Sequence, residues 1–219
     1  MEEKLLRLCE KKHLKLGIMG GTFNPIHYGH LVTAEEALRQ FGLDKVVFIP
    51  TGEPPHKTTG ILATPEDRYL MTVIATASNS DFLVSRIEIG RKGKSYTIDT
   101  LKHLKGIFRD RATLYFITGA DAILEIITWK DTGDVLRLCR FIAATRPGYD
   151  IKKIEQLKSV ISKDFNLDIS GKDHIHLMEI PALAISSTDI RKRIKEGKPI
   201  KYLLPEGVSN YILKNELYR

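Results

Sequence analysis

The chain has 219 residues, 42% of them hydrophobic, and a formal net charge of +7 from 34 basic and 27 acidic side chains. This length allows one domain with a sizeable core, and no uninterrupted apolar run is long enough to cross a membrane. Residues 1–13 mix both charge signs without an apolar centre, so they do not resemble a secretion signal. Cys9 and Cys139 are too few for a disulfide framework or a zinc site. We therefore expect a cytoplasmic enzyme that has neither a membrane partner nor a dedicated metal site.

The positive charge excess can attract nucleic acids or small polyanions. Its densest segment, Arg191 to Lys201, lacks the interleaved aromatic side chains that stack on bases. We interpret this segment as a solvated helix face and expect no nucleic-acid partner.

The most informative stretch begins with an apolar run, Leu14 to Met19, which is typical of a buried strand. Gly20 and Gly21 follow, where a sharp turn and close approach of a ligand to the main chain are allowed. His27 and His30 stand just before residues with helical spacing. A strand, a glycine turn and a helix start form a phosphate site, because free N–H groups and the helix dipole attract anions. The alternative is an ordinary tight turn with two solvent-facing histidines.

A second strand is predicted at Lys45 to Pro50, followed by a loop from Thr51 to Lys57. Ligands bind at the carboxyl ends of parallel strands, so this loop lies at the ligand edge. From its local sequence alone, Lys57 is interpreted as a mobile surface lysine. Thr64 and Pro65 predict a helix start, and the alternation from Phe82 to Ile89 predicts a strand.

The middle of the chain repeats the pattern of strand and helix. The basic segment from Arg91 leads into a helix that either Ser95 or Thr97 could cap. The strand from Thr113 to Thr118 ends at Gly119 and Asp121; this aspartate could cap the next helix or accept hydrogen bonds from hydroxyl groups. A lone tryptophan such as Trp129 usually belongs to a core.

The remaining strands are predicted at Arg140 to Thr145 and His174 to Ile180, with a helix from Ile151 to Ile161 between them. The serines and threonine of residues 186–188 predict another helix start, and Arg191 lies one turn inside it, where its guanidinium can fork onto phosphate oxygens. The last helix is expected at residues 205–217. Strands that alternate with helices indicate a doubly wound α/β domain.

Residues 20–30, Gly-Gly-Thr-Phe-Asn-Pro-Ile-His-Tyr-Gly-His, resemble the signature of the nucleotidylyltransferase superfamily, with its His-x-Gly-His element. Ser-Tyr-Thr-x-Asp-Thr at 95–100, Gly-Ala-Asp at 119–121, Arg-Pro-Gly at 146–148 and Ile-Ser-Ser-Thr at 185–188 resemble segments of the bacterial nicotinate-nucleotide adenylyltransferases. This resemblance implies a Rossmann-like doubly wound parallel sheet with helices on both faces. It implies a single domain over residues 14–219, preceded by an extension over residues 1–13.

The resemblance also implies an activity in NAD biosynthesis, in which ATP transfers its adenylyl group to nicotinate mononucleotide, giving nicotinate adenine dinucleotide and pyrophosphate. Magnesium would arrive with ATP. The oligomeric state stays open, a homo-oligomer included. The catalytic residues implied are His27, His30, Lys57 and Arg191. The residues implied for ATP and its phosphates are Gly20, Gly21, Thr22, Phe23, Ser186, Ser187 and Thr188. Those implied for nicotinate mononucleotide are Thr97, Gly119, Asp121, Trp129 and Arg146.

Two other activities are compatible with parts of this pattern. A pantetheine-phosphate adenylyltransferase resembles the first motif, but such enzymes are usually shorter and lack the Ser-Tyr-Thr element and the tryptophan. A fragment of a class I aminoacyl-tRNA synthetase shares His-x-Gly-His but normally carries Lys-Met-Ser-Lys-Ser, where this chain has Ile-Ser-Ser-Thr. No role is assigned to His56, His174 or His176.

Overall fold

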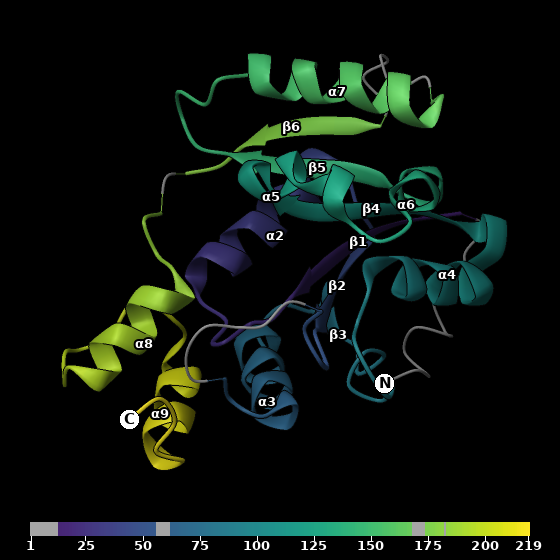
Figure 1. The fold of residues 1–219 in the computed structure, drawn as a ribbon. Helices are drawn as coiled ribbons and strands as arrows, with labels where there is room; N and C mark the ends of the chain where they lie inside the picture. The colour runs from purple at the N-terminus through teal and green to yellow at the C-terminus, as the bar shows by residue number, and fades with distance from the viewer. Residues whose placement is uncertain (1–12, 56–61, 168–173, 182) are drawn as a thin grey trace.

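The computed structural model describes residues 13–55, 62–167, 174–181 and 183–219. Within them, six strands form one parallel sheet in the order β3-β2-β1-β4-β5-β6 (Figure 1). This is the doubly wound Rossmann order, in which the direction of winding reverses between β1 and β4. The strands are β1 Leu14–Gly21, β2 Lys45–Pro50, β3 Phe82–Val84, β4 Ala112–Gly119, β5 Arg140–Thr145 and β6 Ile175–Glu179.

Helices cover both faces of the sheet, as the sequence predicts. Side chains of successive strand residues point to opposite faces, so Leu16 and Ile18 of β1 join one core cluster while Met19 joins the other. Packed on the first cluster are α4 Thr97–Phe108, α5 Ala120–Leu124, α6 Thr132–Leu138 and α7 Lys152–Phe165. Packed on the second are α2 Tyr28–Gln40, α3 Pro65–Thr76, α8 Ser187–Lys195 and α9 Glu206–Lys214. Two short 3₁₀ helices are η1 Arg109–Arg111 and η2 Ile126–Thr128.

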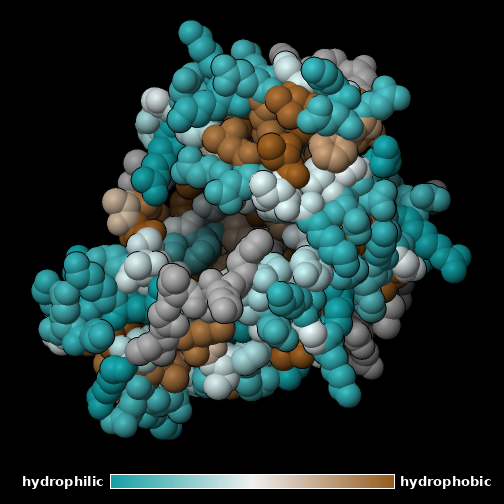
Figure 2. Space-filling view, viewed as in Figure 1, coloured by the Kyte–Doolittle hydropathy of each residue, from teal (hydrophilic) through white to brown (hydrophobic). Residues whose placement is uncertain are grey.

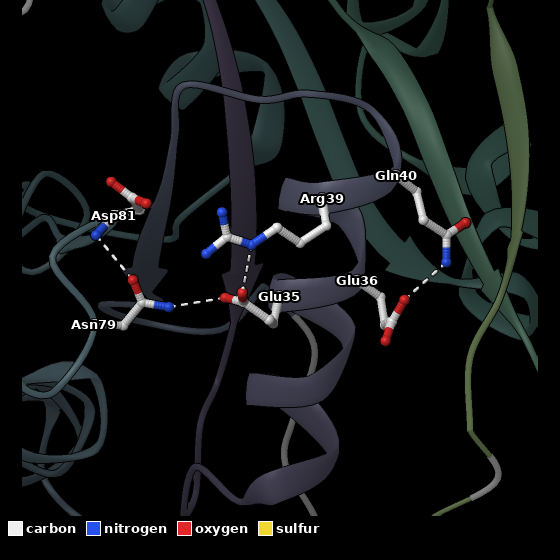
Figure 3. Close-up of polar contacts among 6 residues, drawn as sticks. All are labelled: Glu35, Glu36, Arg39, Gln40, Asn79 and Asp81. Carbon is white, nitrogen blue, oxygen red and sulfur yellow. Dashed lines mark hydrogen bonds and ion pairs between the residues drawn. The ribbon is translucent and has the colours of Figure 1, made fainter.

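The outer part of α2 is fixed by polar contacts to the segment before β3 (Figure 3). Glu35 accepts hydrogen bonds from Arg39 within the helix at 2.7 Å and from the amide of Asn79 at 2.8 Å. The Asn79 side-chain oxygen in turn accepts the Asp81 backbone N–H at 2.9 Å. These contacts join α2 to the entry of β3 and so help to fix the direction of the helix that starts at the ligand edge.

The predicted strand over Phe82 to Ile89 is too long. Only Phe82–Val84 pairs with β2, because the chain then turns. The N–H of Gly90 donates to the Arg86 carbonyl at 2.8 Å, and that of Arg91 donates to the Glu88 carbonyl at 3.2 Å. Backbone groups used in these turns cannot extend a ladder. In the described part of the chain, no helix combines the length and apolar character needed to span a membrane.

Candidate active site

The start of α2 places the two histidines of the signature side by side. The helix begins at Tyr28, slightly earlier than predicted, with His27 as the extended N-cap residue and His30 in the first turn. The backbone N–H of His27 donates to Nδ1 of His30 at 3.2 Å, and the two rings stack with centroids 3.8 Å apart. Because a backbone N–H can only donate, Nδ1 of His30 is the acceptor, and its proton lies on Nε2. His30 therefore has a donor left for a ligand.

Both imidazoles are neutral at pH 7. Burial lowers the pKa of His27 to about 4, and burial together with the neighbouring His27 lowers the pKa of His30 to about 3. The Nδ1 atom of His27 is buried and has no hydrogen-bond partner among the described residues. A neutral imidazole retains one N–H donor, so the pair can bind an anion without first losing or gaining a proton.

Two residues next to the histidines explain how the rings are held. A Cβ on Gly29 would lie 3.0 Å from two atoms of the His27 ring, so a side chain at this position would crowd the ring. Phe23, predicted to contact ATP, is only 3% exposed and meets the His30 ring edge-on with centroids 5.1 Å apart. The structure thus places the Phe23 side chain in the core, in support of His30.

The larger cavity at the ligand edge, about 490 Å³, opens between β1, β4 and β5. The molecule is visibly hollowed near the middle of this face (Figure 2). The cavity brings together residues predicted for both substrates. These are Gly20, His27, His30, Gly119, Asp121 and Arg146.

A second hollow lies on the other side of Gly20 and Thr118, which line both it and the larger cavity. It consists of two adjoining cavities of about 260 and 340 Å³, both lined by Thr97 and Trp129. Gly21 lines the first of them. The predicted acceptor residues are therefore divided: Thr97 and Trp129 lie here, whereas Gly119, Asp121 and Arg146 lie with the histidines.

The first turn of α4 is open at the second hollow. Its N-cap residue is Tyr96, and no side chain caps the helix, so the prediction that Ser95 or Thr97 caps it is wrong. The reason is that the Ser95 N–H pairs with the Glu53 carbonyl at 2.8 Å, which holds Ser95 outside the helix. Uncapped N–H groups at a helix start favour an anion.

Trp129 belongs both to the core edge and to the wall of this hollow. Its ring meets Phe116 edge-on, with centroids 5.6 Å apart, and Phe141, with centroids 6.4 Å apart. The side chain remains partly exposed and lines both smaller cavities. An indole fixed along one side is suited to stacking on a flat ring with its free face.

The start of α8 docks on the loop after β1. Ser186 is the N-cap residue, as expected, and accepts the Asp189 N–H at 3.1 Å. The hydroxyl of Ser187 donates to the Pro25 carbonyl at 2.7 Å, and Nη1 of Arg191 donates to the Asn24 carbonyl at 2.7 Å.

Some of the hydrogen-bond donors that were predicted to bind phosphate, on Ser187 and Arg191, thus donate to other protein groups in this structure. Nη2 of Arg191 also donates to Thr188 at 3.3 Å, and Thr22 offers its carbonyl to a buried side chain. Residues 186–188 and Arg191 are not among those that line the larger cavity, although Ile185 is. Lys57 and His56 lie outside the described residues.

Several residues that line these cavities were not predicted from the sequence, and three of them carry ionisable side chains that bear on the site. Tyr149 lines the larger cavity beside Arg146, and Lys130 lines the 340 Å³ cavity beside Trp129. Glu88, which is 7% exposed, lines the 260 Å³ cavity and accepts the Thr100 hydroxyl hydrogen at 2.7 Å. Burial raises the pKa of Glu88 above its ordinary value. Tyr149 and Lys130 could have been suspected because they stand close in the sequence to Arg146 and Trp129. No local sequence feature distinguishes Glu88.

The described residues contain no group of three or more histidine, cysteine or acidic side chains that could hold a metal ion. What they do contain is a helix start with two neutral imidazoles at the switch point of a doubly wound sheet. Together, this fold and this site define a nucleotide-binding α/β protein.

Comparison with known proteins makes the assignment specific. A family model described as cytidylyltransferase-like matches residues 18–193. A relative from Moorella thermoacetica is 57% identical over 205 residues, which cover 94% of this chain and 92% of the relative. One from Thermoanaerobacter sp. is 53% identical over 209 residues, covering 95% and 96%. Both carry the name "Probable nicotinate-nucleotide adenylyltransferase".

A solved structure supports the fold independently. The Plasmodium falciparum nicotinic acid mononucleotide adenylyltransferase complexed with NaAD superposes with a TM-score of 0.74 at 24% identity, covering 94% of this chain and 98% of that one. At this identity the likeness concerns the fold. The chain belongs to the cytidylyltransferase-like family and, within it, to the nicotinate-nucleotide adenylyltransferases.

Proposed function

We propose that this chain transfers the adenylyl group of ATP to nicotinate mononucleotide, as a cytoplasmic step of NAD biosynthesis. The observation that carries the proposal is the meeting of two hollows at Gly20 and Thr118, the carboxyl ends of β1 and β4. One hollow has the phosphate-binding helix start, and the other has an uncapped helix start beside an indole. A reaction that joins two nucleotides needs two such sites with a common boundary.

In this reaction an oxygen of the acceptor's phosphate attacks the α-phosphorus of ATP. A new P–O bond forms, the bond from the α-phosphorus to the oxygen bridging to the β-phosphate breaks, and pyrophosphate leaves with that electron pair. The attacking phosphate is already an anion, so no protein nucleophile or base is required. The protein contributes positioning and stabilisation of charge.

We assign ATP to the larger cavity. The α2 helix start and the N–H on Nε2 of His30 would donate to phosphate oxygens, and His27 lines the same cavity. Gly20 and Gly21 allow close approach of the main chain. Arg191, the Ser186 to Thr188 helix start and Lys57 are also proposed to bind phosphate.

Magnesium would bind at this site together with ATP, through the phosphate oxygens. It usually keeps several waters and binds through phosphate oxygens with one or two carboxylates, and Asp121 is the carboxylate that lines the larger cavity. The ion would neutralise charge on the phosphate oxygens. Gly119, Asp121 and Arg146 line the larger cavity, and Gly119 directly follows Thr118, which lines both hollows. We propose that these three residues contact the acceptor's ribose and phosphate from the ATP side.

We assign the pyridine ring to the second hollow, on the free face of Trp129. The uncapped start of α4 at Thr97 offers backbone donors to the nicotinate carboxylate, and the Lys130 ammonium lies 4.6 Å from the Tyr96 ring centroid beside it. A nicotinamide acceptor would bring N–H groups to the same donors and leave them unpaired, which discriminates strongly.

The test is pyrophosphate release from ATP and magnesium with a panel of mononucleotide acceptors. We expect release with nicotinate mononucleotide and much less with nicotinamide mononucleotide or phosphopantetheine. Release with phosphopantetheine alone would replace this proposal by a pantetheine-phosphate adenylyltransferase activity.

A further inference from the structure

Arg68 is the most deeply buried charged side chain in the described residues, with 0% of its surface exposed. It lies in the first turns of α3, and all three guanidinium nitrogens donate to backbone carbonyls. Nη1 donates to Thr22 at 2.8 Å, Nη2 to Gly52 at 2.9 Å and Nε to Ala63 at 3.1 Å. These carbonyls belong to three separate segments of the chain.

Stability alone does not explain an arginine here. A buried guanidinium loses its hydration, and an apolar side chain of similar volume commonly serves a core as well or better. Among the described residues Arg68 forms no ion pair with a carboxylate, and its three hydrogen bonds all go to neutral carbonyls. The Glu88 carboxylate interacts with the guanidinium only through its charge, which favours the charged form of Arg68 against the cost of burial. An arginine is nevertheless the side chain that can hold several carbonyls at once in a fixed, planar arrangement.

Two of the three carbonyls, those of Thr22 and Gly52, lie in the loops that follow β1 and β2 at the ligand edge. Thr22 directly follows Gly21, in the loop that ends at His27. Gly52 lies in the loop after β2, against the 88–95 segment: a Cβ on Gly52 would come within 2.3 Å of the Glu88 carbonyl oxygen. The adjacent Glu53 carbonyl accepts the Ser95 N–H at 2.8 Å, two residues before α4 begins. Arg68 thus links the loop of the larger cavity to the helix start of the second hollow.

We propose that Arg68 is a positioning residue that fixes the distance between the two substrate sites. This inference rests on the proposed adenylyl transfer. The two half-sites share the ends of β1 and β4, but each has its own helix start, α2 or α4, so each can bind its substrate without Arg68. The attack geometry, in contrast, depends on the spacing between the halves, and a displacement of about 1 Å can cost about 100-fold in rate.

The experiment compares the wild type with Arg68→Lys and Arg68→Gln. Lysine keeps the charge but cannot reach three carbonyls, and glutamine removes the charge as well, which makes the variant easier to fold. The control is Met71→Ala, at a fully buried position of the same helix that faces the second core cluster. Readouts are the urea midpoint, the Kd for a non-hydrolysable ATP analogue, the KM for nicotinate mononucleotide and the kcat, normalised to protein that binds the analogue.

We expect kcat to fall by about 10-fold or more in both Arg68 variants, with Kd and KM within about 3-fold of the wild type. Met71→Ala should lower the urea midpoint yet keep kcat. A folded Arg68→Lys or Arg68→Gln protein with wild-type kcat overturns the inference, as does an equal loss of kcat in Met71→Ala. A wild type without pyrophosphate release would instead refute the proposed function.

Discussion

Acidification should destabilise the free protein through His27. Its pKa is about 4 in the folded state against an ordinary value of 6.5, because burial disfavours the charged ring. Between about pH 4 and pH 6.5, the unfolded chain therefore binds a proton at His27, whereas the folded chain does not. His27 has no effect on the free energy of unfolding well above pH 6.5, and lowers that free energy as the pH falls from 6.5 towards 4.

At about pH 5.5 the unfolded imidazole is about nine-tenths protonated and the folded one almost neutral, so the difference amounts to about 1.4 kcal/mol. The assay is urea unfolding followed by the fluorescence of the single tryptophan, at about pH 8 and pH 5.5. His27→Gln removes the titrating group, and His103→Gln, at an exposed position of α4, is the matched control.

The loss of stability between the two pH values should be about 1.4 kcal/mol smaller in His27→Gln than in the wild type, and unchanged in His103→Gln. Groups other than the two substituted histidines titrate in all three proteins, so their effects cancel in this comparison. An equal loss in His27→Gln and wild type would refute the conclusion that the ring is buried and neutral.

Further predictions address the site residue by residue. His30→Ala should lower kcat by about 100- to 1000-fold, because a preorganised donor is lost; a folded variant with normal turnover would remove His30 from the mechanism. Gly29→Ala should displace the His27 ring and lower kcat at unchanged KM for the acceptor; unchanged turnover would show that the first turn has room. Trp129→Ala should raise KM for both pyridine mononucleotides and keep most of their ratio; a collapsed ratio would move selectivity to the ring pocket. Tyr218→Phe removes a 2.8 Å hydrogen bond to the Asn24 side chain and should cost about 1 kcal/mol of unfolding free energy, which an unchanged urea midpoint would contradict.

The sequence pattern predicted the fold because each buried parallel strand ends where a helix start signal follows. The apolar run before Gly20 proved to be β1, and the serines before Arg191 proved to begin α8. Most residues that line the larger cavity lie at the ends of the strands or just after them. Such features are local, so hydrophobic periodicity and capping chemistry suffice to find them.

Features that depend on contacts between distant segments of the chain could not be predicted from the sequence. Ser95 fails to cap α4 because its N–H is committed to Glu53, more than 40 residues earlier in the chain. Arg68 looks like any first-turn arginine until three loops converge on it. The division of the acceptor residues between two hollows likewise depends on where β4 and β5 lie relative to β1, and no local pattern contains that information.

The most direct test of the central claim compares kcat/KM for nicotinate and nicotinamide mononucleotides, with ATP and magnesium, by pyrophosphate release. The two acceptors differ only in a carboxylate against an amide, so the ratio reports on the open helix start at Thr97. We predict a preference for nicotinate mononucleotide of about 100-fold or more. Equal use of both acceptors, or no release with either, would contradict the account.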